Sequence, residues 1–214
     1  MPVREQDIRR IFNDARAHYK DGEKSTNKLY DLTAPSVYDT DKIVFKALKR
    51  DFNIQLSIQK VHENPLRVGN YDNIGEKIYK DNAKYGNCVE MNCLAGYLIR
   101  REFPTADIWG ISITPPGDHF FVIVNDLPYA RNITEMSGLP RDTSSFVVDV
   151  WMNICCPAVD YKLNALVKLK NWSAEGKRIT SFVAGVNTQF SPDSKEYVNG
   201  MMDSQLYASK TNAG

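Results

Sequence analysis

The spacing of apolar positions in the first half of the chain predicts helices. Between residues 6 and 19 apolar side chains recur every three or four positions, which is the helical period. The same spacing predicts a helix that begins near residues 40–41 and another over 73–82. The segment 88–101 carries a clear apolar stripe and two arginines in its last turn, where the helix dipole favours cations. We therefore expect an amphipathic helix there, ended by Pro104.

The second half of the chain predicts a sheet. Apolar runs bounded by turn-forming residues predict three neighbouring strands, at 107–113, 119–124 and 146–151. Weaker alternation of apolar and polar residues predicts a strand or hairpin arm at 52–61, and two strands that could extend the sheet at 163–169 and 179–186. We therefore expect an α+β fold with an antiparallel sheet.

The length of 214 residues suits one sizeable domain with its own hydrophobic core. We expect a single domain over 1–214, with a helical N-terminal region at 1–72 and a core at 73–190. From Ser191 onward the chain becomes polar, so 191–214 is expected to be a polar C-terminal tail.

Composition and charge exclude several classes of partner. Hydrophobic residues make up 43% of the chain and charged residues 25%, which are ordinary values for a globular protein. The net charge of +1 provides no field that would attract a nucleic acid or an anionic membrane. No apolar run is long enough to span a bilayer, and the charged N-terminus lacks the apolar stretch of a signal peptide. We expect a soluble protein without a nucleic-acid partner, without membrane insertion and without export by the general secretory route.

The four cysteines are Cys88, Cys93, Cys155 and Cys156, and we expect all of them to be free thiols. A chain of this length and apolar content does not need disulfides to fold. The adjacent pair Cys155 and Cys156, with only three histidines in the chain, does not match a zinc-ligand spacing. We therefore expect neither a metal nor another cofactor.

Cys88 is the candidate nucleophile because it begins its predicted helix. The unpaired N–H groups and positive dipole end of a helix N-terminus lower the pKa of a thiol and can stabilise an oxyanion. Cys93 lies five positions further along, which turns it roughly 140° away from Cys88. Taken alone, a cysteine such as Cys88 is more often a buried core residue than a nucleophile.

His119 and Asp149 are the candidate partners of that thiol. His119 opens one predicted strand and Asp149 lies toward the end of the next, and an antiparallel pair places such positions side by side. The Asp149 carboxylate would then hold one imidazole nitrogen and leave the other facing Cys88. Trp151 is expected to shield the pair from water. Asp118, on the opposite strand face, and Asn153 are weaker alternatives for the orienting group.

The order cysteine, histidine, aspartate resembles the papain-like and transglutaminase-like superfamily. Cys88 and His119 are 31 positions apart, and His119 and Asp149 are 30 positions apart. The segments YGNCVEMNCLAGYLI, GDHFFVIV and FVVDVWMN, within about residues 85–153, are similar to bacterial toxin and effector members of this superfamily. The resemblance implies a helix with the nucleophile packed on an antiparallel sheet. It also implies a thioester intermediate on a protein amide, resolved by deamidation, crosslinking or proteolysis.

One departure from the papain-like pattern affects the expected chemistry. Papain-like proteases place a glutamine shortly before the nucleophile, whereas here the nearest preceding glutamine is Gln59. Asn87, Asn82 and the Cys88 backbone N–H are the expected oxyanion donors in its place. This favours a glutamine deamidase or a transglutaminase-type effector over the alternative of a cysteine peptidase or peptidoglycan amidase.

Two further expectations follow from the resemblance. The substrate is a protein, host proteins included, and the enzyme is cytoplasmic in the producing bacterium or delivered into a target cell by a dedicated secretion system. A non-catalytic binding protein on the same fold is a third alternative, in which Cys88 is only a core residue.

Overall fold

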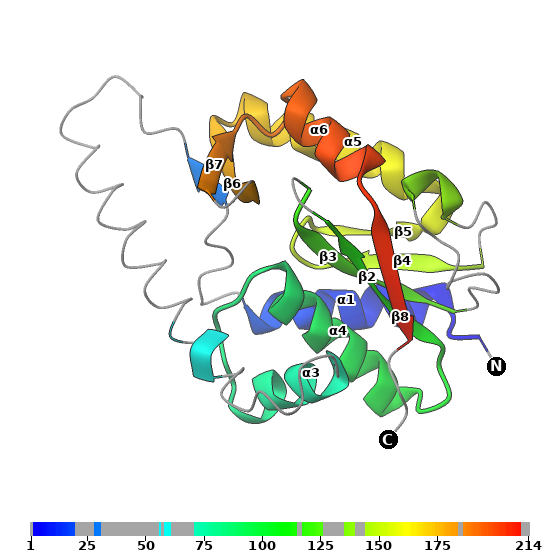
Figure 1. The fold of residues 1–214 in the computed structure, drawn as a ribbon. Helices are drawn as coiled ribbons and strands as arrows, with labels where there is room; N and C mark the ends of the chain where they lie inside the picture. Colours follow the sequence, from blue (N-terminus) through cyan, green and yellow to red (C-terminus); the bar gives the residue numbers. More distant parts are fainter. Residues whose placement is uncertain are drawn as a thin grey trace.

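A five-stranded antiparallel sheet forms the centre of the protein (Figure 1). The computed structural model describes residues 2–19, 28–30, 56, 58–60, 71–114, 117–125, 135–139, 144–183 and 186–210. The strands, in their order across the sheet, are β5 (Ile154–Pro157), β4 (Phe146–Asp149), β3 (His119–Val124), β2 (Ile108–Ile113) and β8 (Leu206–Lys210). All four pairings are antiparallel.

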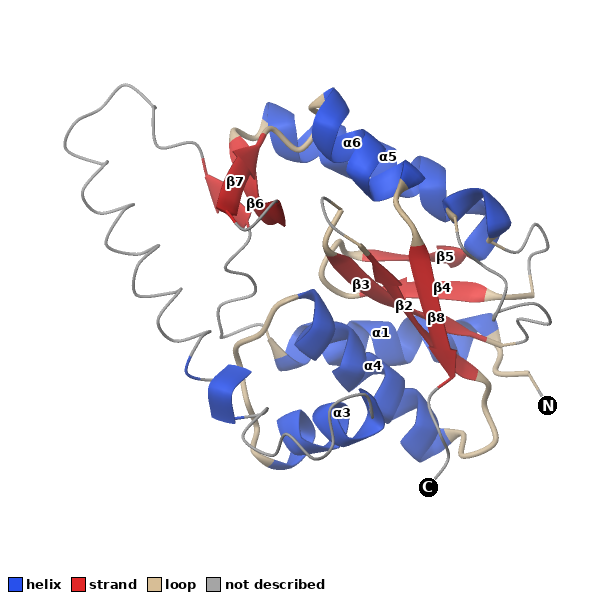
Figure 2. Ribbon diagram, viewed as in Figure 1, coloured by secondary structure: helices blue, strands red, loops and turns tan. Residues whose placement is uncertain are grey.

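Helices cover both faces of this sheet (Figure 2). On one side lie α1 (Glu5–His18), α3 (Tyr71–Lys80) and α4 (Cys88–Glu102), and on the other lie α5 (Ala158–Ala174) and α6 (Lys195–Asp203). Every residue of β3 is buried, as expected for a central strand with both faces covered. A short 3-10 helix, η3 (Met136–Gly138), precedes β4. No helix in the described part of the chain is long and apolar enough to cross a membrane.

Gly75 allows α3 to pack closely against α4. A Cβ atom at this position would lie 2.2 Å from the carbonyl oxygen of Cys93, so a larger residue would force the helices apart. Ile78, about one turn further along α3, is fully buried. Replacing Gly75 with alanine would therefore displace α4, the helix that begins with Cys88.

Several sequence predictions are confirmed. The predicted helices at 6–19, 73–82 and 88–101 correspond to α1, α3 and α4. The predicted strands at 107–113, 119–124 and 146–151 correspond to β2, β3 and β4, and they are neighbours in one sheet as expected. The coarse α+β class with an antiparallel sheet is therefore correct.

The predicted strand at 163–169 is wrong, because this segment lies inside α5. Tyr161, Ala165 and Leu169 are buried and recur every four residues, which is a helical stripe, whereas Leu163 and Val167 are exposed. Exposed apolar residues between the buried ones made the stripe look like strand alternation.

The predicted strand at 179–186 forms, but in another sheet. It corresponds to β6 (Lys177–Val183), which pairs with β1 (Lys28–Tyr30) and β7 (Val186–Phe190) and does not extend the central sheet. A hairpin between β6 and β7 was not expected from the sequence.

The segment after Ser191 is not simply a polar tail, because it contains α6 and β8. β8 pairs with β2 and completes one edge of the central sheet, with Leu206 opposite Ile113. The predicted helix near 40–41 lies outside the described residues. Of the predicted strand at 52–61, the described residues 56 and 58–60 are helical.

Candidate active site

A capping box holds the end of α4 where Cys88 lies. Asn87 is the N-cap residue, and its backbone N–H donates a hydrogen bond to Oε2 of Glu90 at 2.9 Å. The Glu90 backbone N–H in turn donates to the Asn87 side chain. Glu90 is buried beneath this turn, and a Cβ atom on Gly86 would lie 2.7 Å from the Glu90 Cβ. Glycine at 86 therefore leaves room for the carboxylate that fixes the backbone of Cys88.

The capping box changes which groups can act as oxyanion donors. The Asn87 backbone N–H is already used by Glu90, so it cannot take the role that the sequence suggested. Among the described residues, no acceptor contacts the backbone N–H of Cys88 or Val89. The first N–H groups of a helix lack partners within the helix and point out of its positive end. The two N–H groups after the N-cap are therefore the candidate donors.

His119 and Asp149 form a buried pair across β3 and β4. The register pairs Val122 with Val148, so Asp149 lies opposite Phe121, two residues along β3 from His119 and on the same face of the sheet. Nε2 of His119 lies 2.7 Å from Oδ2 of Asp149, and both side chains are buried. The prediction that these two residues are neighbours is confirmed.

Three further donors hold the Asp149 carboxylate. The Tyr161 hydroxyl donates to Oδ2 at 2.8 Å, and the Met152 backbone N–H donates to Oδ1 at 2.9 Å. The Asn92 side-chain amide lies 3.5 Å from Oδ1. A buried carboxylate with this many donors stays ionised and keeps a single orientation.

Asn92 links the nucleophile's helix to the strands of the pair. Its Nδ2 donates to the Phe120 carbonyl at 2.7 Å, and its Oδ1 accepts the Val150 backbone N–H at 2.7 Å. The sequence interpretation missed this residue. The signal in the sequence was an amide four positions after Cys88, one turn along the same face of the predicted helix. In the structure this amide is fully buried.

The charges of the pair stabilise one another. Burial alone would lower the pKa of His119, but the charge and hydrogen bond of Asp149 outweigh it and raise that pKa above the usual range. Burial alone would raise the pKa of Asp149, but the charge of His119 and the bonds from Met152 and Tyr161 lower it. The two shifts therefore favour an imidazolium beside a carboxylate.

The remaining nitrogen of His119 is the one that the Cys88 thiol can reach. Nε2 is occupied by Asp149, and Nδ1 is buried without a partner of full hydrogen-bond geometry among the described residues. The thiol is close enough that its hydrogen bond and charge contribute to the raised pKa of His119. Cys88 itself is only partly buried. The three residues predicted from the sequence therefore meet at one place.

Trp151 covers the imidazole. Its ring centroid lies 5.0 Å from that of His119 at an interplanar angle of 42°, and the side chain is buried. Trp172 from α5 packs edge-on against Trp151 at 5.2 Å and 90°. This arrangement matches the expectation that Trp151 shields the pair from water.

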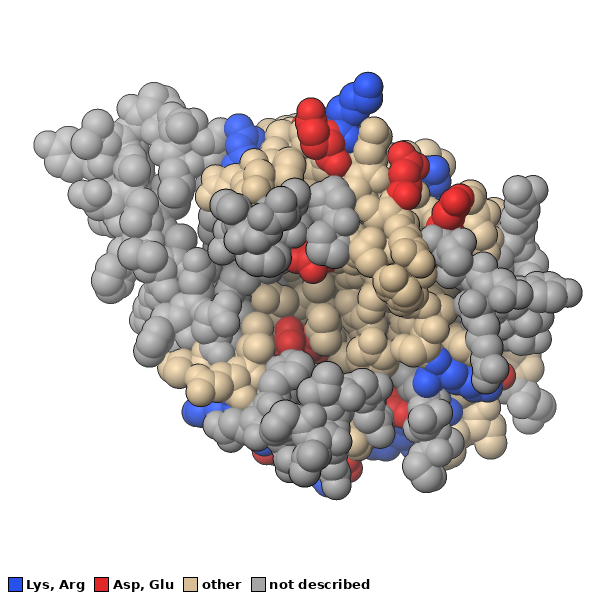
Figure 3. All heavy atoms as spheres, viewed as in Figure 1, with Lys and Arg blue, Asp and Glu red and all other residues tan. Residues whose placement is uncertain are grey.

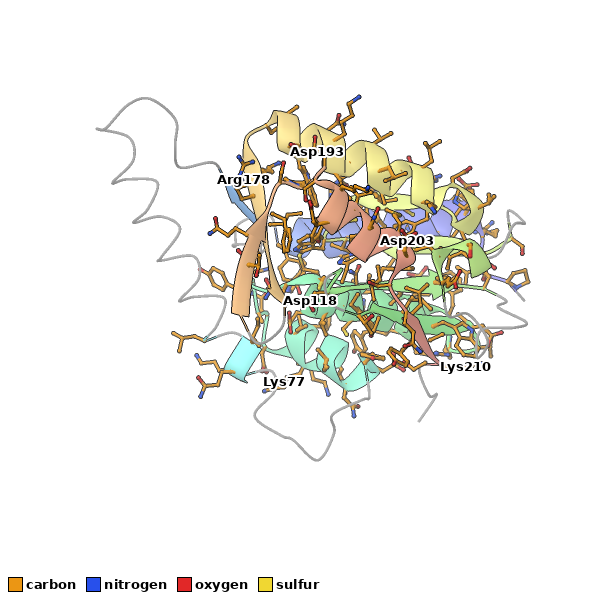
Figure 4. The ribbon with its side chains drawn as sticks, turned by 45° about the horizontal axis from the view of Figure 1, so that its top comes forward. Lys77, Asp118, Arg178, Asp193, Asp203 and Lys210 are labelled. Carbon is orange, nitrogen blue, oxygen red and sulfur yellow. The ribbon has the colours of Figure 1, made fainter. Side chains whose placement is uncertain are left out.

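The alternative orienting residues do not contact His119 through hydrogen bonds in the described structure. Asp118 precedes β3 with a φ of 41° and is exposed. Asn153 is also exposed, in the turn after β4 with a φ of 60°. Figure 4 shows Asp118 near the middle of the view, with Asp203 to its upper right, Arg178 and Asp193 above it, and Lys77 and Lys210 below it. Figure 3, which has the same view as Figure 1, shows a hollow near the centre of the molecule whose visible lining is mainly uncharged.

Tyr197 is a second residue that the sequence interpretation missed. It belongs to α6, within the segment that was expected to be a tail. Its hydroxyl donates a hydrogen bond to the Gly117 carbonyl at 3.4 Å. Burial and the nearby charge of Cys88 raise the pKa of Tyr197. The chain beyond Ser191 therefore contributes to the surroundings of the thiol.

The surroundings of the other three cysteines oppose ionisation of their thiols. Cys93 is buried, and burial raises the pKa of its thiol well above the usual range. Burial raises the pKa of Cys155 to about 11 and that of Cys156 to about 12. All four thiols are free. No group of three or more potential metal ligands occurs among the described residues.

Comparison with known protein families, with curated proteins and with solved structures finds no significant match to this chain.

Proposed function

We propose that this protein is a cysteine-dependent enzyme that attacks an amide carbonyl, with the side-chain amide of a protein glutamine as substrate. The observation that carries the proposal is the buried His119–Asp149 pair, whose free nitrogen is directed to Cys88 at a helix N-terminus. A nucleophile, a base and a group that orients the base are the parts that such chemistry requires.

The first step forms a thioester. The Cys88 thiolate attacks the carbonyl carbon, and the oxyanion that develops lies near the N–H groups of Cys88 and Val89. The imidazolium of His119 then gives its Nδ1 proton to the leaving nitrogen. The C–N bond breaks, ammonia departs and the acyl group remains on Sγ.

The second step releases the acyl group. Neutral His119 takes a proton from a water molecule, whose oxygen attacks the thioester carbon. The C–S bond breaks, which returns the thiolate of Cys88 and the imidazolium of His119 and leaves a carboxylic acid on the substrate, whose proton is then lost to solvent to give the carboxylate. An amine in place of water would give a crosslink by the same route.

The surroundings of Cys88 favour attack on the side-chain amide of a glutamine over cleavage of a peptide bond. No glutamine precedes Cys88 at the distance where papain-like proteases place one, and the Asn87 N–H is used by Glu90. The cysteine peptidase and the non-catalytic binding protein are the alternatives that the experiment separates.

The test is incubation of the protein with unfolded glutamine-containing proteins, followed by intact-mass spectrometry. Deamidation adds about one mass unit per event without fragments, and hydroxylamine captures the thioester as a hydroxamate. Fragments would identify a peptidase, and amine incorporation would identify a transglutaminase. If the wild type gives none of these products and its Cys88 labels no faster than Cys155, the proposal is wrong.

A further inference from the structure

A pocket of about 230 Å³ is lined in part by Trp151, the residue whose ring packs against that of His119. Trp151 therefore connects the pocket to the candidate triad. Met91, one turn after Cys88, contributes another part of the wall. None of the chemistry proposed above uses this pocket.

Three cations from three separate elements line the pocket. They are Arg16 from the last turn of α1, Lys168 from α5 and Lys177 at the start of β6. The only carboxylate in the lining is Glu175, which forms an ion pair with Lys177. The pocket therefore carries an excess of positive charge.

Lys168 is the cation most affected by this crowding. It is partly buried on α5, and burial together with the charges of Lys177 and Arg16 lowers its pKa, while Glu175 and the more distant Asp149 oppose the shift. An anion bound among these cations would relieve the repulsion between them.

The pocket also has an aromatic wall. Trp151 and Trp172 meet edge-on there, and Lys177 lies over the Trp172 ring with its Nζ 5.7 Å from the ring centroid. A few charged groups on an apolar and aromatic lining are typical of sites for small organic groups. The lining thus suits a small anionic group that lies against the edge of this aromatic wall.

We propose that this pocket binds an anionic group, a carboxylate or a phosphate, contacted by Arg16, Lys168 and Lys177. Its use as an anchor that holds a substrate next to Cys88 rests on the function proposed above. The binding itself does not depend on catalysis, because none of its three cations belongs to the candidate triad.

The test is titration of the protein with inorganic phosphate and, separately, with glutarate, each against sodium chloride at matched ionic strength. Tryptophan fluorescence and calorimetry report the binding, in the wild type and in Cys88→Ala. We expect a saturable response to at least one of the two anions in both proteins. Phosphate alone, glutarate alone or both would identify which source of negative charge the pocket accepts.

Lys168→Gln is the diagnostic variant, and Lys162→Gln is its matched control. Both lysines lie on α5, but Lys162 is exposed and does not line the pocket. Lys168→Gln should weaken anion binding about tenfold, the effect expected for loss of a charge-assisted hydrogen bond, whereas Lys162→Gln should leave it unchanged. Equal weakening by both variants, or no saturable binding in the wild type, would overturn the proposal.

A second measurement uses the unmutated chain. An amine-reactive ester should label Lys168 more slowly when the anion is present, while the labelling of Lys162 should not change. Equal labelling of Lys168 with and without a saturating anion would contradict the assignment. Because both assays are independent of thiol chemistry, an unreactive Cys88 would refute the proposed function and leave the pocket standing.

Discussion

The N-terminus of α4 and strand β5 each hold a partly buried cysteine beside a basic residue, yet their surroundings differ. At β5, Nη1 of Arg9 donates a hydrogen bond to the Cys155 carbonyl at 2.7 Å, but burial dominates and raises the pKa of the thiol to about 11. At α4, Cys88 faces a histidine whose positive charge is fixed by a buried carboxylate. From this difference we expect that a nearby cation alone does not activate a thiol. We predict that the cation must also be held in place and that the thiol must lie at a helix end.

The largest expected effect comes from removing the Cys88 thiol. Cys88→Ala should reduce turnover by about 10⁴-fold or more, as loss of a nucleophile does in enzymes whose catalytic residues act as a unit. Cys155→Ala is the matched control and should keep wild-type turnover. Hydroxamate formation in the presence of hydroxylamine measures both. Retained turnover in Cys88→Ala would remove the basis of the comparison.

A somewhat smaller effect is expected from the orienting acid. Asp149→Asn should lower turnover by about 10²- to 10⁴-fold, because an amide neither stabilises the imidazolium nor selects the same tautomer. Asp118→Asn, the neighbouring exposed acid, should change turnover by no more than a few-fold. Steady-state rates of the two purified variants decide the matter, and a reversed order would assign the role to Asp118.

The comparison of the two thiols can be made directly by alkylation. At pH 7 a thiol with a pKa of about 11 is ionised to only about 1 part in 10⁴, so Cys155 should react slowly with iodoacetamide. Cys88 should label at least about 100-fold faster, and His119→Ala should abolish that advantage. Peptide mass spectrometry of each labelled cysteine provides the rates. Equal rates in the wild type would favour the binding-protein alternative.

The His119–Asp149 pair should also make stability depend on pH. The folded pKa of His119 is raised above 6.5, so its stabilisation is fully present below pH 6.5 and is lost as the pH rises through the folded value. The folded pKa of Asp149 is lowered below 3.8, so its stabilisation is present above pH 3.8 and is lost as the pH falls through the folded value. The free energy of unfolding, measured by thermal denaturation, should therefore be greatest between pH 3.8 and pH 6.5, by about 1–3 kcal/mol. Asp149→Asn should make this free energy depend less on pH.

The smallest expected effect concerns Asn92. Asn92→Ala should lower the free energy of unfolding by about 1–3 kcal/mol, because it leaves the buried Val150 N–H without its acceptor. Asn164→Ala on the exposed side of α5 removes a hydrogen bond to Asp160 and should cost about 0.5 kcal/mol or less. Denaturant unfolding of both variants measures the difference. Equal costs would show that Asn92 does not tie α4 to the strands.

Much of the candidate site was predictable because its three main residues occupy simple positions in local elements. Cys88 begins a helix, His119 begins a strand and Asp149 ends the next strand. Helix and strand periodicity locate such positions, and antiparallel pairing then brings the last two together. The helix α5 was misassigned at 163–169 because its exposed Leu163 and Val167 obscured the buried stripe. β5 was not predicted because its apolar run before Pro157 is only three residues long.

The sequence by itself determined the α+β class, the central strands and the order of cysteine, histidine and aspartate, because all of these follow from local spacing. Only the tertiary structure decided that Asn92 and Tyr161 hold Asp149, that Glu90 uses the Asn87 N–H, and that β8 completes the sheet. It also decided that Arg16, Lys168 and Lys177 share one pocket. These contacts join residues far apart along the chain or depend on side-chain direction, and periodicity carries no information about either.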